Sequence, residues 1–410
     1  MTWKSTAIHC VRFPSLARQA LAFQPGTSQN GRGATDCLSA GLVSDCIHSC
    51  CLLTPGRFQA TCGCLFVRFH IFSPAGLRLN PGPFPLELSM SRAIVTDFTF
   101  PDLSIEEQLL SPEGVGLEGH QAKTVNALLP LVADADLIIT QFAPLQRPVI
   151  EAMRRARVII RYGIGVDNVD LVAAREKGIP VCNVPDYCIN EVADQTMAFL
   201  LAQTRQVLPN HRLIADGRWG LAVPLTQMRA LRDQTVGVVG YGRIGRAVVE
   251  RLIPFGCRVL VHDPLMVLGP VGGTEVTAVP LGELLAESDI ITLHCPSLDS
   301  TKKMINHQSL SRMKPGSLLI NVGRGDLVDP DALLDSLRNG HLAGASLDVF
   351  DPEPIPSDHP IRSLPNVVLA SHIASASPRA VRTLRESVAK IALAVHQGQT
   401  PPNIVNGVRR

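Results

Sequence analysis

A run of glycines followed by one acid stands in the middle of the chain. Gly240, Gly242 and Gly245 come directly after the apolar segment Val236–Val239 and before a helical pattern. In such a Gly-x-Gly-x-x-Gly run the first glycine permits a tight turn, the second lets backbone approach a pyrophosphate, and the third lets the helix lie close to the sheet. Asp263 stands 18 residues after the last glycine, where a carboxylate can accept hydrogen bonds from a ribose 2′-hydroxyl. The spacing therefore predicts a dinucleotide site, and a strand–helix turn without a ligand is the alternative.

Asp263 also bears on the choice between the two nicotinamide dinucleotides. NADP carries a 2′-phosphate, which a carboxylate at this place repels and which normally needs a nearby cation. No Lys or Arg follows Asp263 before Lys302. The sequence therefore predicts NAD as the cofactor.

The composition is that of an ordinary globular protein and restricts the partners. The chain has 410 residues, of which 46% are hydrophobic and 18% charged, with a net charge of +2. These values do not favour a nucleic acid or a membrane surface as partner. No apolar run approaches the length of about 18 residues that a transmembrane helix needs.

Residues 1–89 differ from the rest of the chain. They carry seven Lys/Arg, three Asp/Glu and seven of the 11 cysteines. These cysteines lack the spacing of a zinc site, and no metal site is expected. We expect a disordered or spurious leader that ends before Met90. Because the first 35 residues are basic, contain Ser/Thr and lack acids, a mitochondrial transit peptide is the alternative to a cytoplasmic protein.

From Met90 onward, strand-like apolar runs alternate with helical patterns. This alternation is typical of α/β layers with parallel sheets. The expected strands are Ala93–Thr96, Leu137–Thr140, Val158–Arg161 and Ile179–Cys182 in a first block, and Val236–Val239, Arg258–Val261, Ile290–His294, Leu318–Val322, Ala345–Val349 and Val367–Ala370 in a second.

The position of the glycine run predicts how the chain is divided. We predict two doubly wound α/β domains, a flavodoxin-like substrate domain and an inserted Rossmann NAD domain. The substrate (catalytic) domain would comprise residues 90–190 plus 378–410, and the NAD-binding domain residues 191–377. The active site is expected in the cleft between these two domains.

Several longer patches resemble the D-isomer-specific 2-hydroxyacid dehydrogenase family, in its phosphoglycerate dehydrogenase and C-terminal-binding-protein-like branch. The patches are Leu-His-Cys-Pro at 293–296, Asn-Val-Gly-Arg-Gly-Asp-Leu-Val-Asp at 321–329, Leu-Asp-Val-Phe-Asp-Pro-Glu-Pro at 347–354, Asn-Val-Val-Leu-Ala-Ser-His at 366–372, and Tyr-Gly-Ile-Gly-Val-Asp-Asn at 162–168. They occur in the family's order and cover nearly all of residues 90–410. The resemblance implies an NAD-dependent oxidoreductase acting on the CH–OH group of donors, which moves a hydride reversibly between NAD(H) and a small 2-keto or 2-hydroxy acid of the D series.

The same resemblance assigns roles to three side chains. Arg324 would hold the substrate carboxylate and carbonyl, which suits a planar, permanently charged guanidinium. His372 would be the acid/base that gives a proton to the developing alkoxide. Glu353 would pair with His372, orient its ring and favour the imidazolium form.

Further contacts are implied by the family's motifs. The substrate carboxylate would meet backbone N–H groups of Gly163, Ile164 and Gly165. A homodimer is also implied. The residues implied to bind the cofactor are Gly240, Gly242, Arg243, Ile244, Gly245, Asp263, His294, Cys295, Pro296, Val322, Gly323 and Asp348.

The substrate stays open between 3-phosphoglycerate-like and hydroxypyruvate- or glyoxylate-like acids. A phosphate on the third carbon would need additional cations, for which Arg161 and Arg147 are candidates, although a solvated surface position suits each of them equally. The alternative function is an NAD-sensing binding protein similar to the C-terminal-binding-protein corepressors. The sequence Ile-Ala-Ser-Ala-Ser after His372 lacks the Trp of that branch and argues against this alternative.

Overall fold

The computed structural model describes residues 90–272 and 275–408. All of them belong to one compact unit. The expectations of a leader and of mitochondrial targeting concern residues 1–89 and lie outside the described residues. Among those described, no helix combines the length and apolar character that crossing a membrane requires.

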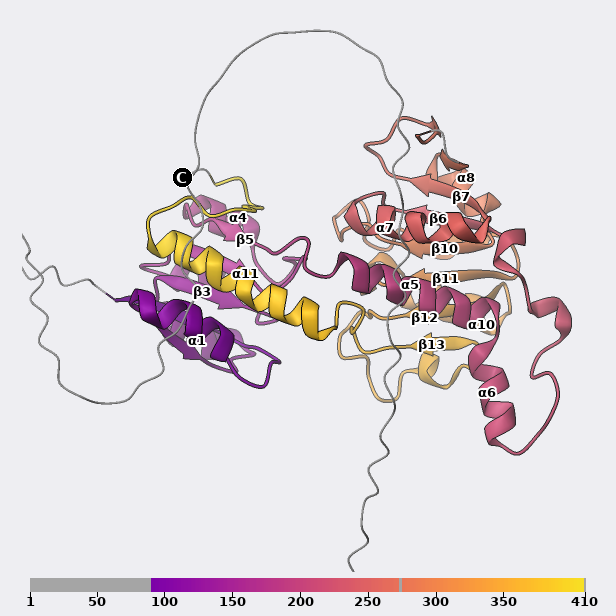
Figure 1. The fold of residues 1–410 in the computed structure, drawn as a ribbon, viewed down its shortest axis with the longest axis horizontal. Helices are drawn as coiled ribbons and strands as arrows, with labels where there is room; N and C mark the ends of the chain where they lie inside the picture. The colour runs from indigo at the N-terminus through magenta and orange to yellow at the C-terminus, as the bar shows by residue number, and fades with distance from the viewer. Residues whose placement is uncertain (1–89, 273–274, 409–410) are drawn as a thin grey trace, which may run out of the picture. The chain divides into compact units, whose positions relative to one another are not determined.

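The first sheet has five parallel strands in the order β2-β1-β3-β4-β5, which is the flavodoxin-like order (Figure 1). Branched apolar residues fill the central strands, and Ile138 and Ile139 are both fully buried although they point to opposite faces. β2 was not predicted, because its residues Val-Gly-Leu-Glu-Gly have little apolar character. The strands are β1 (Ser91–Val95), β2 (Val115–Gly119), β3 (Leu137–Thr140), β4 (Val158–Arg161) and β5 (Val181–Cys182).

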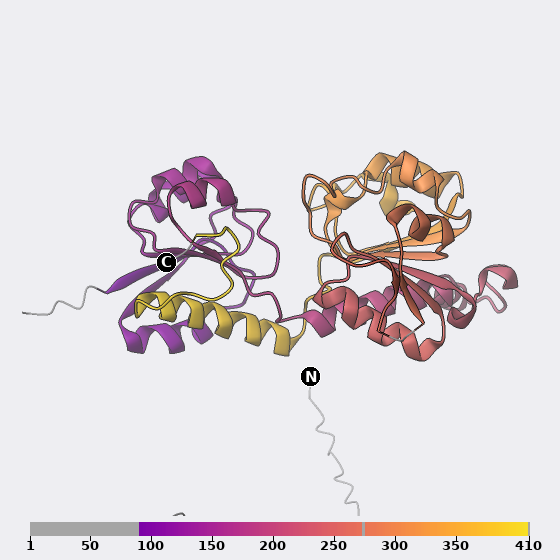
Figure 2. The same ribbon diagram turned by 90° about the horizontal axis from the view of Figure 1, so that it is seen from above.

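Helices cover both faces of this sheet (Figure 2). The last helix, α11, lies along α1 (Figure 1) and packs Leu384 and Val388 into the core formed with the first sheet. Ser377 caps α11 by accepting a hydrogen bond from Ala380 N, and Pro378 begins the helix. The helices of this part are α1 (Ser104–Leu110), α2 (Val125–Val132), α3 (Arg147–Ala152), α4 (Leu171–Glu176) and α11 (Pro378–His396).

The second sheet has eight strands in the order β13-β12-β11-β10-β6-β7-β9-β8. From β9 to β12 this is the order of a Rossmann sheet, and β8 at the edge is the one antiparallel member among the described strands. The six expected strands are present, and the short β8 and β9 were missed. The strands are β6 (Thr235–Val239), β7 (Arg258–His262), β8 (Gly269–Pro270), β9 (Val276–Ala278), β10 (Ile290–Leu293), β11 (Ser317–Asn321), β12 (Leu342–Leu347) and β13 (Val367–Leu369).

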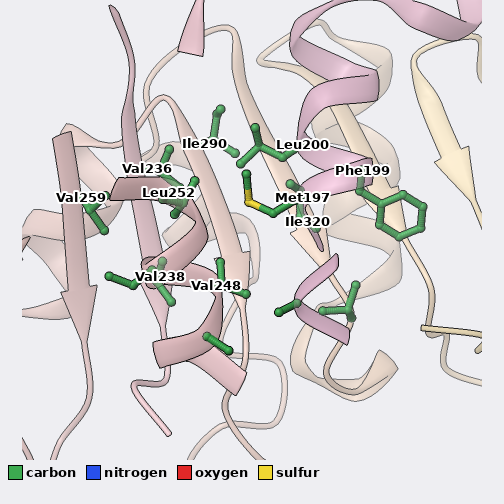
Figure 3. Packing of buried hydrophobic residues seen from close by; sticks show 14 of the residues in the cluster. Met197, Phe199, Leu200, Val236, Val238, Val248, Leu252, Val259, Ile290 and Ile320 are labelled. Atoms are coloured by element: carbon green, nitrogen blue, oxygen red, sulfur yellow. The ribbon is translucent and has the colours of Figure 1, made fainter. Parts of the chain in front are cut away.

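The long helix α5 packs on this second sheet. Figure 3 shows Met197 and Leu200 of α5 in the same buried cluster as Val236 of β6 and Leu252 of α7. Gln203, also on α5, is buried and donates from Nε2 to the Ala345 carbonyl oxygen at 2.8 Å, which ties α5 to β12. The helices of this part are α5 (Ile189–Thr204), α6 (Val207–Ala215), α7 (Arg243–Leu252), α8 (Leu281–Glu287), α9 (His307–Ser311) and α10 (Pro330–Arg338).

Candidate active site

The glycine run forms the turn between β6 and α7. Gly240 has a φ of +94°, and a Cβ there would lie 2.6 Å from the Cys295 nitrogen. A Cβ at Gly245 would lie 2.0 Å from the Gly240 oxygen, so only glycine lets α7 lie this close to the turn. In the described part of the chain, no atom lies within 4 Å of a Cβ built at Gly242, and no side chain caps the helix that begins at Arg243. The first N–H groups of α7 therefore face open space, which suits a pyrophosphate.

Asp263 follows β7 and lies beside the same turn. Its Oδ2 accepts from Tyr241 N at 2.9 Å and its Oδ1 from Leu265 N at 3.0 Å. Because a carboxylate offers about four acceptor positions, capacity for ribose hydroxyl groups remains. The tertiary structure also brings Arg246 of α7 toward this turn, with its guanidinium 5.4 Å from the centre of the Tyr241 ring. Arg246 precedes Asp263 in the chain, so the lack of Lys and Arg after Asp263 does not mean that the turn has no cation nearby.

A cavity of about 850 Å³ opens next to the glycine turn and is lined by residues that follow strands of both sheets. Gly163, Gly240, Gly245, Asp263 and Glu353 are not among the lining residues, although each is close in sequence or in space to one that is. The expected site residues that line the cavity are Ile164, Gly165, Gly242, Arg243, Ile244, His294, Cys295, Pro296, Val322, Gly323, Arg324, Asp348 and His372.

His372 and Glu353 form a hydrogen-bonded pair at this cavity. His372 Nδ1 lies 2.9 Å from Glu353 Oε2, and Glu353 Oε1 accepts from Phe350 N at 2.8 Å. The side chains are 35% and 34% exposed, so water reaches both of them. Burial raises the pKa of Glu353, but the hydrogen bond and positive charge of His372 outweigh it and leave this pKa below its usual value. The pairing orients the ring and leaves Nε2 to exchange a proton.

Asp348 holds the backbone that presents His372. Its Oδ1 and Oδ2 accept from the N–H groups of Ile373 and Ala374 at 2.9 and 2.8 Å, and its carbonyl accepts from His372 N at 2.8 Å. These bonds support the left-handed backbone of His372, which has a φ of +57°. Asp348 is fully buried, and burial raises its pKa. The carboxylate implied to contact the cofactor is thus engaged by the His372 loop.

Arg324 follows β11 and contacts the loop after β4. Its Nε donates to Asp167 Oδ2 at 2.7 Å and its Nη1 to the Gly323 oxygen at 2.8 Å. Its Nη2 lies so close to Gly165 that a Cβ there would be 1.5 Å away. Asp167 was missed as a partner, although it stands inside the matched patch at 162–168.

Gly325 allows the Arg324 loop to meet the Glu353 loop. A Cβ at Gly325 would lie 1.9 Å from the Phe350 oxygen, so any other residue would push the two segments apart. Phe350 N is the donor to Glu353, so this close approach helps to place the acid–base pair beside Arg324. In the Arg324–Gly325 dipeptide the arginine therefore supplies the charge, and the glycine allows the close approach of the two loops.

The glycine loop at 163–165 departs from expectation at one position. Gly163 N donates to the Arg161 oxygen at 2.9 Å and so is not free for a substrate. The reason is a tight i to i+2 turn centred on Tyr162, and Gly163, which ends the turn, has a φ of +144°. The Gly163 oxygen accepts from Val184 N at 3.0 Å, and the Ile164 oxygen accepts from Asn183 Nδ2 at 2.6 Å. These bonds hold the two carbonyl groups in place. The residues of this loop that line the cavity are Ile164 and Gly165, and Gly163 does not line it.

The cavity has further lining residues that the sequence analysis did not single out. They lie on loops that follow several different strands, and no sequence motif marks them as site residues. Among the residues that the structure describes, no group of three or more His, Cys, Asp and Glu side chains is placed to hold a metal ion. The additional polar lining residues include Asp167, Tyr187, Ser297, Asp326 and Ser375.

Comparison with known proteins agrees with this geometry. The family model of the D-isomer specific 2-hydroxyacid dehydrogenase NAD binding domain matches residues 197–374. A glyoxylate reductase of Korarchaeum cryptofilum is 39% identical over 282 residues, which are 68% of this chain and 85% of that protein.

Two solved structures show the same architecture at the level of the whole fold. D-Lactate dehydrogenase from Aquifex aeolicus, complexed with NAD and lactic acid, is 28% identical with a TM-score of 0.70 and covers 77% of this chain and 99% of its own. An NADPH-dependent glyoxylate/hydroxypyruvate reductase from Sinorhizobium meliloti, in complex with NADP and malonate, is 31% identical with a TM-score of 0.70 and covers 78% of this chain and 99% of its own. The chain therefore belongs to the D-isomer-specific 2-hydroxyacid dehydrogenase family and is an NAD(P)-dependent oxidoreductase acting on the CH–OH group of donors.

Proposed function

We propose that the protein reduces small 2-keto acids of the glyoxylate and hydroxypyruvate class to 2-hydroxy acids with NADH, and that it forms the D isomer where the product is chiral. The observation that carries the proposal is one cavity of about 850 Å³ lined by Arg324, by His372 and by the start of α7. Glyoxylate reductases from Korarchaeum cryptofilum and Thermococcus onnurineus, 39% and 38% identical to this chain, support the same substrate class.

The residues divide the work of the reaction. Arg324 holds the substrate carboxylate together with the Ile164 and Gly165 backbone, because its Nη2 already lies against Gly165. His372 donates a proton to the developing alkoxide oxygen, and Glu353 stabilises the charged ring beforehand. When bound, the dinucleotide supplies the hydride that reaches the keto carbon.

We also propose limits for the two domains. Residues 90–190 plus 378–410 would form the substrate domain and residues 191–377 the NAD-binding domain. The packing of α11 with the first sheet and of α5 with the second supports these limits.

The homodimer implied by the family resemblance belongs to the same proposal. Trp219, Leu221 and Leu225 follow α6 and are 95%, 59% and 70% exposed, which supplies apolar surface for a second copy. Light scattering on the purified protein should give twice the mass of the chain, and the mass of a single chain would contradict the dimer.

The test of the reaction is NADH oxidation at fixed pH with glyoxylate, hydroxypyruvate and pyruvate. Turnover of glyoxylate or hydroxypyruvate is expected, with the D isomer as the product from hydroxypyruvate, since the glycolate formed from glyoxylate is achiral. Tight NADH binding without turnover of any 2-keto acid would favour a binding protein instead.

Glu353→Gln should move the pH profile of kcat/KM for keto-acid reduction toward lower pH. His372 holds the pKa of this carboxylate below its usual value, which reflects an attraction between the carboxylate and a positively charged ring, and the amide of Gln cannot provide that attraction. Reduction needs the protonated ring, so activity should fall off earlier as the pH rises. Profiles of wild type and variant that superimpose would show that the pair does not act in catalysis.

Asp263→Asn should reduce the preference for NADH over NADPH. The substitution keeps the size of the side chain and one acceptor oxygen but removes the charge that repels a 2′-phosphate. We expect the ratio of kcat/KM values for the two cofactors to change about tenfold, which corresponds to about 1.4 kcal/mol. If the ratio stays constant, Asp263 does not face the ribose.

A further inference from the structure

Tyr162 stands between the end of β4 and the loop at 163–165. It is the central residue of the tight turn in which Gly163 N donates to the Arg161 oxygen at 2.9 Å. Its own N–H donates to the Thr140 oxygen of β3 at 2.8 Å, and only 1% of the residue is exposed. The central residue of such a turn orients the peptide groups on either side of it. Whatever fixes the Tyr162 side chain therefore also fixes the start of the loop.

The Tyr162 hydroxyl is bound to a buried carboxylate of another element. It donates to Glu106 Oε1 of α1 at 2.9 Å, and Glu106 is fully buried. Burial, together with the negative charge of Glu106, raises the pKa of Tyr162 well above its usual value, so the hydroxyl keeps its proton and remains a donor. The Phe100 ring meets the Tyr162 ring edge to face, with the ring centroids 5.2 Å apart. A hydrogen bond to a charged acceptor is stronger than one between neutral groups, so this bond fixes the direction of the ring.

Arg385 of α11 holds Glu106 in place. Its Nε donates to Glu106 Oε1 and Oε2 at 3.0 and 3.1 Å, and its Nη2 donates to Oε2 at 2.7 Å. The same Nη2 donates to the Asp102 carbonyl oxygen at 2.8 Å, which ties the guanidinium to the backbone before α1. None of the described residues of α11 lines the cavity. Through Glu106 and Tyr162, the last helix is nevertheless linked to the start of a loop that does.

The loop after Tyr162 offers two backbone donors to the cavity. In the described part of the chain, neither Ile164 N nor Gly165 N donates a hydrogen bond, and both residues line the cavity. The Ile164 oxygen is held by Asn183 Nδ2 at 2.6 Å. The positions of the two free N–H groups therefore depend on this bond and on the place where Tyr162 starts the loop.

We propose that Tyr162 is a positioning residue, whose bond to Glu106 places the loop at 163–165 for the substrate carboxylate. The inference rests on the proposed function, in which this loop and Arg324 hold that carboxylate. Stability alone does not explain the buried ion pair behind Tyr162, because well-packed apolar side chains often replace such a pair without loss of stability. Apolar side chains do not replace the direction that hydrogen bonds give to the Tyr162 ring.

The test is Tyr162→Phe, which removes the hydroxyl and leaves the ring and the pair of Glu106 and Arg385 in place. The KM for glyoxylate and hydroxypyruvate should rise about 10-fold, the lower end of what a hydrogen bond to a charged group contributes. The kcat at saturating keto acid and the Kd for NADH should not change, because neither His372 nor the glycine turn is altered. Steady-state NADH oxidation and a fluorescence titration with NADH measure these values.

A second variant tests the same bond from the other partner. Glu106→Leu, Arg385→Met and Tyr162→Phe together replace the three side chains by apolar ones and leave no buried charge unpaired. This triple variant should fold, as urea unfolding will show, and its KM for the keto acids should be raised as in Tyr162→Phe. A purely structural role would leave the KM of the folded triple variant at the wild-type value.

Ser91→Ala is the matched control at the other end of α11. Ser91 is buried at the start of β1, at the edge of the sheet opposite to the loop, and its Oγ lies 2.8 Å from His396 Nδ1. Loss of this hydrogen bond should leave the KM unchanged. A wild-type KM in Tyr162→Phe, or an equal rise of the KM in Ser91→Ala, would overturn the proposal. Absence of turnover of every 2-keto acid by the wild type would instead refute the proposed function.

Discussion

His372→Asn should lower kcat for keto-acid reduction by about 10²- to 10⁴-fold, the usual contribution of a positioned general acid. The variant removes the proton donor that Glu353 orients at 2.9 Å. Asparagine is chosen because His372 has a φ of +57°, and Asn tolerates the left-handed region better than Ala. The measurement is the steady-state rate of NADH oxidation at saturating substrate.

A matched control for this variant is another histidine–carboxylate pair on the surface. His307 Nε2 lies 3.4 Å from Asp335 Oδ2, outside the cavity lining, and its side chain is 68% exposed. His307→Asn should leave kcat unchanged. A similar loss of kcat in both variants, or a His372→Asn enzyme that keeps wild-type kcat, would show that His372 is not the proton donor.

Glu106→Ala should lower the free energy of unfolding by about 3–5 kcal/mol, because it leaves a buried arginine charge without its partner. Glu106 is fully buried, and Arg385 of α11 is 5% exposed. Arg385 Nη2 donates to Glu106 Oε2 at 2.7 Å, and Tyr162 Oη donates to Glu106 Oε1 at 2.9 Å. Burial lowers the pKa of Arg385, but the bond to Glu106 outweighs it and the pKa is raised overall. Urea unfolding followed by circular dichroism measures the change.

Two further variants show whether the loss comes from the unpaired charge. Arg382 and Glu386, on the same helix, form an exposed pair at 2.8 Å, so Glu386→Ala should barely affect unfolding. Replacing both buried partners, as Glu106→Leu with Arg385→Met, should restore much of the stability lost in Glu106→Ala. If Glu106→Ala unfolds at the same urea concentration as Glu386→Ala, the buried pair does not stabilise the fold. Because Tyr162 immediately precedes the Gly163–Gly165 loop, Glu106→Ala should also raise the KM for the keto acid.

The strands that the sequence predicts well are those whose local pattern is sufficient. Leu137–Thr140 and Val158–Arg161 were predicted with the limits that β3 and β4 have. Both are short, branched apolar runs, which is how strands buried on both faces appear in a sequence. The missed β2, Val115–Gly119, has two glycines and an acid, and becomes a strand because it pairs in register with β1.

For the site, too, some features follow from the local sequence and others from tertiary packing. By itself the sequence determined the α/β class, the dinucleotide turn and the family, because Gly240 and Gly245 answer steric demands that arise within a few residues of themselves. The tertiary structure decided which groups are free to react. It pairs Arg324 with Asp167 across 157 residues, ties up the Gly163 N–H, and leaves Arg161 without an anion. These outcomes depend on how distant loops pack against one another, and no spacing along the chain encodes the distance or the direction of such contacts.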